Sequence, residues 1–251
     1  STDPNLRGAP SGHTVAVLLR PGSRSRGSVP GDVTIVASLE EAAAFAPELV
    51  VEAAGHAAVR EIVPDCLSRG LPVLISSIGA LHDERLFKRL VGMAESHGSR
   101  LLLASGALGA LDYVRAVRAA EVLSLAYESR KPPAAWAAEL RMLGHDAAAL
   151  ASPVTLFEGT AREAAAAYPQ NLNVAAALAL AGPGFERTRV AVVCDPEAVG
   201  NTHSVKAESA LGTMTITIAN QPSPANPKSS RIVCRSLLAA VEQYFSPVQM
   251  L

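Results

Sequence analysis

A strand–helix–strand unit is encoded in residues Leu49–Ser76, which read LVVEAAGHAAVREIVPDCLSRGLPVLIS. Leu49–Ala53 and Pro72–Ser76 are short apolar runs with little alternation, a pattern typical of strands buried on both faces of a parallel sheet. Between them, Ala57–Arg69 predicts a helix, and Gly70 follows where a helix C-terminus favours a residue that tolerates positive φ. This order predicts two parallel strands joined by a helical crossover.

The same alternation extends to both sides of this unit. Further strands are predicted at Val15–Leu19, Val33–Ala37 and Leu101–Ala104, and further helices at Leu39–Phe45 and Asp83–His97. The repetition indicates a Rossmann-type, doubly wound parallel sheet that binds a dinucleotide. Such a fold normally begins with a strand and a G-x-G-x-x-G turn. This sequence contains no such motif, so we expect that the first strand and its glycine-rich turn are not represented in the chain.

A different pattern begins after Ser105. Strands are predicted at Glu121–Arg130 and Val190–Cys194, two more across His203–Asn220 with a break at Gly212, and helices at Thr160–Ala167, Asn173–Ala181 and Ser230–Phe245. Thr213–Ile218 alternates Thr with Met or Ile, as a half-exposed antiparallel strand does. We therefore expect an α/β protein in which residues 1–106 bind the dinucleotide and residues 107–229 form a second α/β domain with a mixed or antiparallel sheet.

Composition narrows the classes of function. Among 251 residues, 22 Lys and Arg balance 23 Asp and Glu, and the basic residues are dispersed, which argues against nucleic-acid binding. Cys66, Cys194 and Cys234 lie far apart without metal-ligand spacing, so we expect reduced thiols and no metal site. No apolar run approaches the length of a membrane span, and Ser1–Asn5 does not resemble a signal peptide. We expect a cytoplasmic protein.

One long segment carries a resemblance to a known family. Phe157–Gly182 reads FEGTAREAAAAYPQNLNVAAALALAG, which sets polar amides directly against a helix of Ala, Leu and Val, and Asn201-Thr202-His203 follows further along the chain. Four more blocks occur in the family's order: EAAGH at Glu52–His56, SGALGALD at Ser105–Asp112, RKPPAAW at Arg130–Trp136 and NPKSS at Asn226–Ser230. Together they resemble the L-aspartate dehydrogenases, NAD(P)-dependent enzymes linked to quinolinate and NAD synthesis.

This resemblance implies a reaction, a cofactor and partners. L-aspartate would be oxidised with NAD or NADP to iminoaspartate or oxaloacetate and ammonia, and the reverse reaction would be a reductive amination. It also implies a homodimer, and a C-terminal helix in residues 230–251 that packs back on the first domain. Two alternatives remain: a dehydrogenase for another small acid, of the homoserine or dihydrodipicolinate type with a lysine or a differently spaced histidine, or a non-catalytic dinucleotide-binding protein.

His203 is the candidate catalytic residue, because imidazole titrates near neutral pH and can both accept and donate a proton. It follows a turn-like segment, Pro196–Asn201, which we expect to present it at a sheet edge, and the resemblance places the family's catalytic histidine here. A histidine of a surface turn is the alternative. By the same resemblance Asn173 and Ala107 contact the dinucleotide, although Asn173 also suits a simple helix cap.

Three further residues are candidates for the cofactor site. Gly55 and His56 follow a strand at the carboxyl edge of the sheet, where Gly55 lets backbone approach the cofactor and His56 either lines the nicotinamide site or caps a helix. Arg20 follows an earlier strand, and no Asp or Glu lies between it and Pro30. An arginine there accommodates the 2′-phosphate of NADP, and the alternative is a solvated loop.

Substrate carboxylates need cationic, hydroxyl or amide donors. Asn226, Lys228 and Ser229 form a compact polar group and are the predicted substrate-binding residues. Arg162 is interpreted as a solvated residue of a helix surface without a role. The remaining histidines, His13, His82, His97 and His145, are interpreted as surface residues.

Overall fold

The computed structural model describes residues 13–120, 123–168, 173–224 and 226–249, with only the backbone for residues 226–228. The chain divides into two compact units, Ser1–Val50 and Val51–Leu251. In the first unit, β1 (Ala16–Leu18) runs parallel to β2 (Thr34–Val36), with η2 (Arg24–Ser28) between them and α1 (Leu39–Ala43) after them. The Ser38 side chain caps α1 by accepting a hydrogen bond from the Glu41 amide.

The second unit contains a three-stranded sheet in the order β3–β4–β5, formed by Val50–Glu52, Val73–Ile75 and Leu101–Leu103, with β4 and β5 parallel. Its connections contain α2 (His56–Glu61), α3 (Val63–Ser68), η3 (Ile78–His82) and α4 (Glu84–Ser96). The single helix predicted at Ala57–Arg69 is wrong, because it is broken at Ile62. Pro64 has no amide hydrogen to donate and its ring crowds the preceding turn, which accounts for the break.

A five-stranded mixed sheet follows in the order β10–β9–β6–β8–β7. The strands are β6 (Ser124–Lys131), β7 (Val154–Thr160), β8 (Thr188–Cys194), β9 (Asn201–Ser209) and β10 (Gly212–Asn220). Only β6 and β8 pair in parallel, and the other three pairs are antiparallel. The predicted fold class, a Rossmann-type parallel sheet with a second mixed α/β sheet, is confirmed.

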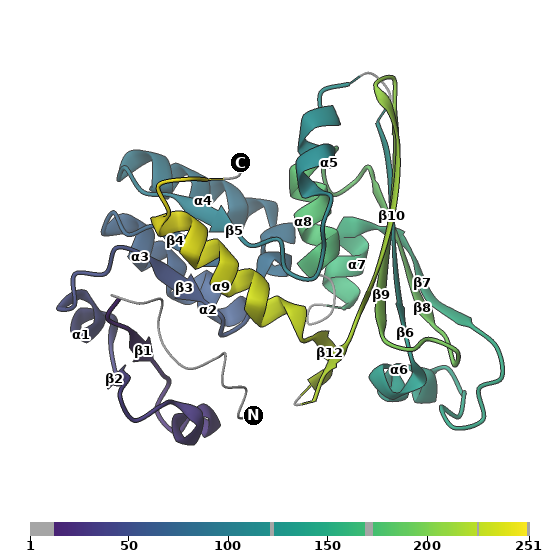
Figure 1. The fold of residues 1–251 in the computed structure, drawn as a ribbon, viewed down its shortest axis with the longest axis horizontal. Helices are drawn as coiled ribbons and strands as arrows, with labels where there is room; N and C mark the ends of the chain where they lie inside the picture. Colours follow the sequence, from purple (N-terminus) through teal and green to yellow (C-terminus); the bar gives the residue numbers. More distant parts are fainter. Residues whose placement is uncertain (1–12, 121–122, 169–172, 225, 250–251) are drawn as a thin grey trace. The chain divides into compact units, whose positions relative to one another are not determined.

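Helices α5 (Leu111–Val117), α7 (Ala161–Ala167) and α8 (Asn173–Ala181) lie on one side of this mixed sheet (Figure 1). Residues Val174–Ala179 of α8 are all buried, because their small side chains let the helix pack closely on its neighbours. The predicted start of α7 is a capping box, in which Thr160 and Glu163 satisfy each other's amide hydrogens. The strand β7 and the helix α5 were not predicted from the sequence.

After β6 come η4 (Pro133–Ala135) and α6 (Ala137–Met142), and after β10 the short hairpin β11 (Pro222–Ser223) and β12 (Asn226–Ser230) leads into α9 (Ile232–Phe245). The Ser236 hydroxyl of α9 accepts a hydrogen bond from the Gly106 amide at 2.9 Å, so this helix contacts the turn after β5. The domain limits 1–106 with 230–251, and 107–229, stay a prediction.

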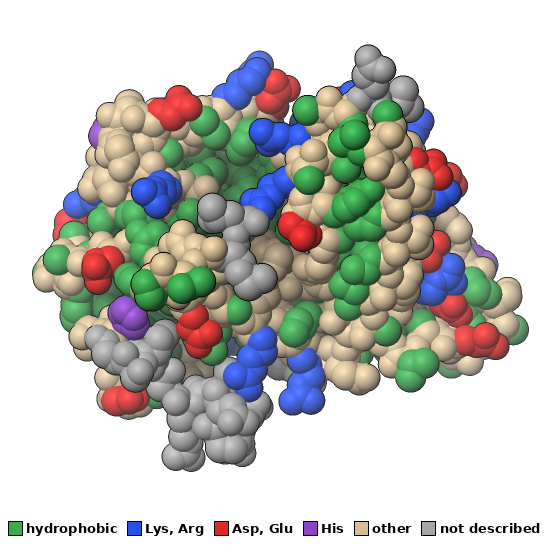
Figure 2. All heavy atoms as spheres, turned by 45° about the horizontal axis from the view of Figure 1, so that its top comes forward, with side chains coloured by type: hydrophobic (Ala, Val, Ile, Leu, Met, Phe, Trp, Pro, Cys, Tyr) green, Lys and Arg blue, Asp and Glu red, His purple; other side chains and the backbone are tan. Residues whose placement is uncertain are grey.

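The surface agrees with the dispersed charge of the sequence. On the face seen in Figure 2, basic and acidic side chains are interspersed and form no large field of one sign. Within the described ranges, no helix is long and apolar enough to cross a membrane. Within those ranges, no three His, Cys, Asp or Glu residues form a group that could hold a metal ion. Cys66 and Cys194 are buried and Cys234 is exposed, and none of them forms a disulfide.

Candidate active site

A cavity of about 90 Å³ lies beyond the carboxyl ends of β4 and β5. Its lining comes from the segments after these strands, the end of β6, the start of α8, β9, the end of β12 and α9: Ser76, Ile78, Ala104, Ser105, Gly106, Ala107, Lys131, Asn173, Val174, His203, Ser229, Ser230, Val233 and Leu237. Ligands of open α/β sheets bind at the carboxyl ends of parallel strands. The cavity therefore occupies the position that the fold makes available for chemistry.

His203 lies deeper than its sequence context suggested. It is the third residue of β9, which is flanked by β6 and β10, so the expectation of a sheet edge after a turn is wrong. The side chain is only 3% exposed and sits opposite Ser129 of β6. Its Nδ1 atom is 2.8 Å from the hydroxyl oxygen of Tyr127, and the two rings are stacked. The other ring nitrogen, Nε2, is buried without a hydrogen-bond partner among the described residues.

The protonation of His203 also differs from the expectation. Burial, and then the positive charge of Lys131, lower the pKa of His203 to about 4, so the imidazole is neutral at physiological pH rather than titrating there. Burial raises the pKa of the Tyr127 hydroxyl, which therefore keeps its proton. A neutral hydroxyl both donates and accepts, so Tyr127 can hold Nδ1 in either tautomer of the imidazole.

Lys131 is the functional candidate that the sequence analysis missed. It ends β6, is 2% exposed and places its Nζ atom 5.3 Å from the ring centroid of the fully buried Trp136. The available signal was the period of two, since Tyr127, Ser129 and Lys131 share one face of the strand. A lysine in place of the histidine was expected in the alternative small-acid dehydrogenases. Here it accompanies a histidine, so the residue type alone does not separate these classes.

The structure brings Asn173 and His56 together around Gly79. Asn173 begins α8, and its Oδ1 atom accepts a hydrogen bond from the Gly79 amide of η3 at 2.8 Å. A Cβ atom at Gly79 would lie 2.9 Å from both Asn173 Oδ1 and His56 Nε2, so any other residue here would force both side chains to shift. The pKa of His56 is lowered, mainly by burial and then by Arg60. The Asn173 side chain therefore joins α8 to η3 beside a partly buried imidazole.

The turn after β3 is organised by Glu52, a second residue that the sequence analysis did not single out. Its buried carboxylate accepts hydrogen bonds from the amides of Ala54 and Gly55, both at 2.8 Å, and from the amide and hydroxyl of Ser77 after β4. Gly55 has a φ of 111°, a conformation that L side chains rarely adopt. A Cβ atom there would meet nothing within 4 Å, so glycine is needed for the backbone conformation and leaves open space beside it.

Ala107 lies in the predicted turn after β5, 8% exposed. Its carbonyl oxygen accepts a hydrogen bond from Asn220 Nδ2 at 2.9 Å, and the preceding Gly106 has a φ of 67°. Ser229, the third member of the predicted substrate group, also lines the cavity, and its carbonyl oxygen accepts from Asn201 Nδ2 at 3.1 Å. The side chains of Asn226 and Lys228 lie outside the described residues.

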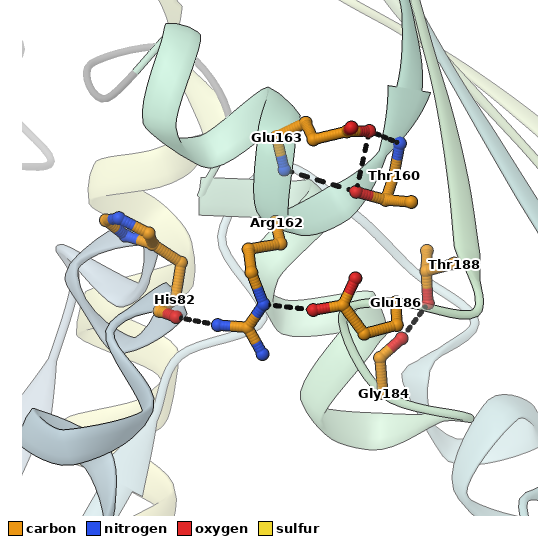
Figure 3. Close-up of polar contacts among 7 residues, drawn as sticks. All are labelled: His82, Thr160, Arg162, Glu163, Gly184, Glu186 and Thr188. Atoms are coloured by element: carbon orange, nitrogen blue, oxygen red, sulfur yellow. Dashed lines mark hydrogen bonds and ion pairs between the residues drawn. The ribbon is translucent and has the colours of Figure 1, made fainter.

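Arg162 is not a solvated surface residue, which corrects the interpretation of the sequence. Figure 3 shows its guanidinium reaching from α7 to the carbonyl oxygen of His82 and to the carboxylate of Glu186. The same group lies 5.4 Å from the ring centroid of Phe185. His82 is half-buried, and its Nδ1 atom is 2.8 Å from the Gly79 carbonyl oxygen. Arg162 thus ties α7 to η3, the segment whose Gly79 amide also donates a hydrogen bond to Asn173 of α8.

Arg20 lies in the first unit, where its side chain is exposed and its carbonyl oxygen accepts from the Ser23 amide. Its preference for NADP stays a prediction.

Two family models match the chain in succession. Residues 13–104 match the NAD binding domain of homoserine dehydrogenase, and residues 112–244 match the C-terminal part of aspartate dehydrogenase. The L-aspartate dehydrogenase 2 of Bordetella pertussis is 47% identical over 92% of this chain and 87% of its own. The L-aspartate dehydrogenase of Methanosarcina barkeri is 42% identical over 81% of this chain and 76% of its own.

Solved structures of similar fold include other dehydrogenases. The aspartate dehydrogenase of Thermotoga maritima superposes with a TM-score of 0.71 at 25% identity, over 95% of this chain and 89% of that one. A putative homoserine dehydrogenase from Archaeoglobus fulgidus, at 14% identity and a TM-score of 0.50, shares the fold. The fold and the nucleotide-binding domain define an oxidoreductase that uses NAD or NADP. The chain belongs to the L-aspartate dehydrogenase family.

Proposed function

We propose that this chain oxidises L-aspartate to iminoaspartate, which hydrolyses to oxaloacetate and ammonia, and that it also runs the reverse reductive amination. The observation that carries this proposal is the cavity itself, in which a buried histidine with one ring nitrogen unsatisfied by described residues lies beside a buried lysine. Relatives named L-aspartate dehydrogenase over most of their length favour aspartate over the homoserine and dihydrodipicolinate alternatives.

The residues of the cavity suit a nicotinamide ring. Ala104, Gly106 and Ala107 are small, so they leave room for a flat ring at the carboxyl end of β5. Asn173 and His56 supply polar atoms near the same edge. We assign Ala107, Asn173, Gly55 and His56 to the cofactor, and when bound the cofactor accepts or delivers the hydride.

The chain itself has to move a proton at the substrate carbon. In the direction of oxidation, Nε2 of neutral His203 accepts a proton from the water that attacks the imine carbon of iminoaspartate. The Nδ1 hydrogen is meanwhile donated to the Tyr127 oxygen, so the ring does not need to turn when it becomes charged. In the direction of amination, the imidazolium returns this proton to the hydroxyl group that leaves the carbinolamine as water.

The experiment replaces His203 with Asn, which keeps a hydrogen-bonding side chain that cannot titrate. We expect kcat to fall roughly 10²- to 10⁴-fold while the affinity for NADPH changes little. The exposed His145→Asn is the matched control and should retain full activity. Absorbance of the reduced nicotinamide, measured with oxaloacetate and ammonia, gives the kcat of the His203→Asn and His145→Asn variants. A His203→Asn enzyme with near-normal kcat would leave the proton transfer to another group.

The proposal extends to the cofactor preference, the substrate-binding residues, the domain limits and the oligomeric state. Arg20 accommodates the 2′-phosphate of NADP, and Asn226, Lys228 and Ser229 contribute to the substrate site. Residues 1–106 with 230–251 form the cofactor domain, and residues 107–229 the catalytic and dimerisation domain. The protein works as a cytoplasmic homodimer in pyridine nucleotide synthesis. Sedimentation equilibrium tests the dimer directly, because a single species at the monomer mass would contradict it.

A further inference from the structure

The short segment η3 is attached near both of its ends to helices that lie on the mixed sheet. Near its start, the Gly79 amide donates a hydrogen bond to Asn173 Oδ1 at the beginning of α8. At its end, the carbonyl oxygen of His82 accepts from the guanidinium of Arg162 on α7 (Figure 3). The ring of His82 joins these two ends, since its Nδ1 atom lies 2.8 Å from the Gly79 carbonyl oxygen. Two helices therefore fix one segment of five residues.

The guanidinium of Arg162 is itself fixed by the turn that follows α8. Its Nε atom donates to the carboxylate of Glu186, and the group lies 5.4 Å from the ring centroid of Phe185, which is 8% exposed. The backbone of this turn is tied to the end of α8, because the Gly184 amide donates to the Ala179 carbonyl oxygen at 3.0 Å. Both ends of α8 thus reach η3, one directly and the other through Arg162.

The forked shape of a guanidinium suits this arrangement. Its Nε and Nη1 atoms donate in two directions at once, so one group bonds a carboxylate on one side and a backbone carbonyl on the other. A lysine ammonium is a compact charge on a flexible stem and does not fix two partners in this way. The ion pair of Arg162 with Glu186 adds little stability, because the side chains are 34% and 65% exposed and water screens their charges. Arg162 therefore contributes to geometry more than to folding energy.

The segment that Arg162 holds is part of the cavity wall. Ile78, the first residue of η3, lines the cavity together with Asn173 and Val174 of α8. A shift of η3 would move Ile78 and the Gly79 amide, and would loosen the side chain of Asn173, which the proposed function assigns to the cofactor. Misplacing a reactant by about 1 Å costs about 10²-fold in rate, even when the change lies far from the chemistry. The contacts of Arg162 thus affect where a nicotinamide ring can lie.

We propose that Arg162 is a positioning residue, which holds η3 against α7 and α8 and so places the nicotinamide ring relative to the substrate. Arg162 is not among the described residues that line the cavity, so it acts through η3 and Asn173. The assignment rests on the proposed function for the identity of the reaction. Its effect on cofactor binding does not depend on which substrate is used.

The test compares Arg162→Met with Glu163→Ala in the full chain. Arg162→Met keeps an unbranched apolar stem and removes both hydrogen bonds of the guanidinium. Glu163 is the next residue of α7 and is exposed, and its carboxylate accepts from the amide and hydroxyl of Thr160, so Glu163→Ala weakens the same helix without touching η3. We expect Arg162→Met to raise the calorimetric Kd for NADPH roughly tenfold. Glu163→Ala should keep the Kd of the wild type, although it lowers the melting temperature.

A single turnover of L-aspartate by enzyme that carries NADP separates positioning from general damage. A partly unfolded preparation gives a smaller amplitude of NADPH absorbance at the normal rate constant, because its folded molecules are intact. A misplaced ring gives the full amplitude at a lower rate constant, and we expect a fall of roughly 10- to 100-fold for Arg162→Met. Arg162→Lys restores the charge and one donor, so its rate constant should lie between those of Arg162→Met and the wild type. A normal rate constant at reduced amplitude in Arg162→Met would overturn the proposal.

The titration with NADPH keeps this inference distinct from the proposed function. If the wild type does not turn over aspartate, the proposed function fails, while tenfold weaker binding of NADPH by Arg162→Met still supports the positioning role. If Arg162→Met binds NADPH as tightly as the wild type, the positioning role fails whether or not aspartate is oxidised. If Arg162→Met does not fold, Arg162→Lys, which keeps the charge and loses the fork, takes its place in both measurements.

Discussion

The buried imidazole of His203 should make the stability of the fold depend on pH within a defined window. Its pKa in the folded chain is about 4, against an ordinary value of 6.5. Because the folded-state pKa is lowered, the unfolded chain takes up the proton first as pH falls. The contribution of His203 is therefore fully present above pH 6.5 and is lost as pH falls from 6.5 towards 4.

The size of this effect follows from the two pKa values. Between pH 7 and pH 4.5, the difference in proton uptake lowers the free energy of unfolding by about 2 kcal/mol. His203 is only 3% exposed, so solvent does little to reduce this figure. The loss is a large part of the stability of an ordinary domain, which is about 5–15 kcal/mol.

Urea unfolding at pH 7 and pH 4.5 measures the effect in wild type and in His203→Gln, which cannot titrate in this range. The chain contains one tryptophan, Trp136, which is fully buried, so its fluorescence reports the unfolding of this region. The wild type should lose about 2 kcal/mol more than His203→Gln between the two pH values. His145→Gln, at an exposed position, controls for the loss of a histidine elsewhere. Equal losses in wild type and His203→Gln would refute the reasoning.

Three more substitutions test the neighbourhood of the cavity and the first unit. Tyr127→Phe removes the hydroxyl 2.8 Å from the imidazole of His203, and if His203 transfers the proton as proposed, kcat should fall about tenfold with little change in the KM for NADPH, as steady-state kinetics will show. Gly79→Ala would place a Cβ atom 2.9 Å from Asn173 Oδ1 and His56 Nε2, so both side chains must shift. We expect the Kd for NADPH to rise roughly tenfold. An unaltered calorimetric titration would exclude the Asn173 and His56 side chains from the cofactor site. Arg20→Asp should shift preference from NADP towards NAD, and an unchanged ratio of kcat/KM for the two cofactors would identify a plain solvated loop residue.

The parts of the fold that follow from local pattern were predictable. The apolar runs of β4 and β8 and the alternation of β10 each identify their strand because the signal lies within a few residues. The start of α7 was equally local, since Thr160 and Glu163 form a capping box three residues apart. The break between α2 and α3 was missed because the apolar spacing continues across it.

Among the residues that line the cavity, Ala107, Asn173 and His203 were singled out mainly by the family resemblance rather than by a local pattern. The period of two puts Lys131 on the face of Tyr127 and Ser129, but it does not show what covers that face, because the covering residues belong to α8, β9 and Trp136, which come later in the chain. Arg162 looks like any charged residue on a helix surface until η3, from another part of the sequence, packs against it. The pKa of His203 depends likewise on burial between two strands, which no short window of sequence contains.

The strict alternation of β6 makes this strand intolerant of a change in length. Tyr127, Ser129 and Lys131 are buried, whereas Glu128 and Arg130 between them are turned to the other face of the strand. Deleting or inserting one residue upstream within β6 would move every side chain to the opposite face. After a deletion, Glu128 would stand where Tyr127 now lies, and after an insertion, Arg130 would stand where Lys131 now lies. Either change would alter the sign or the position of the charge in the cavity. During evolution, length variation in this enzyme should therefore collect in loops such as residues 144–153 and be purged from β6, even where single substitutions in that strand survive.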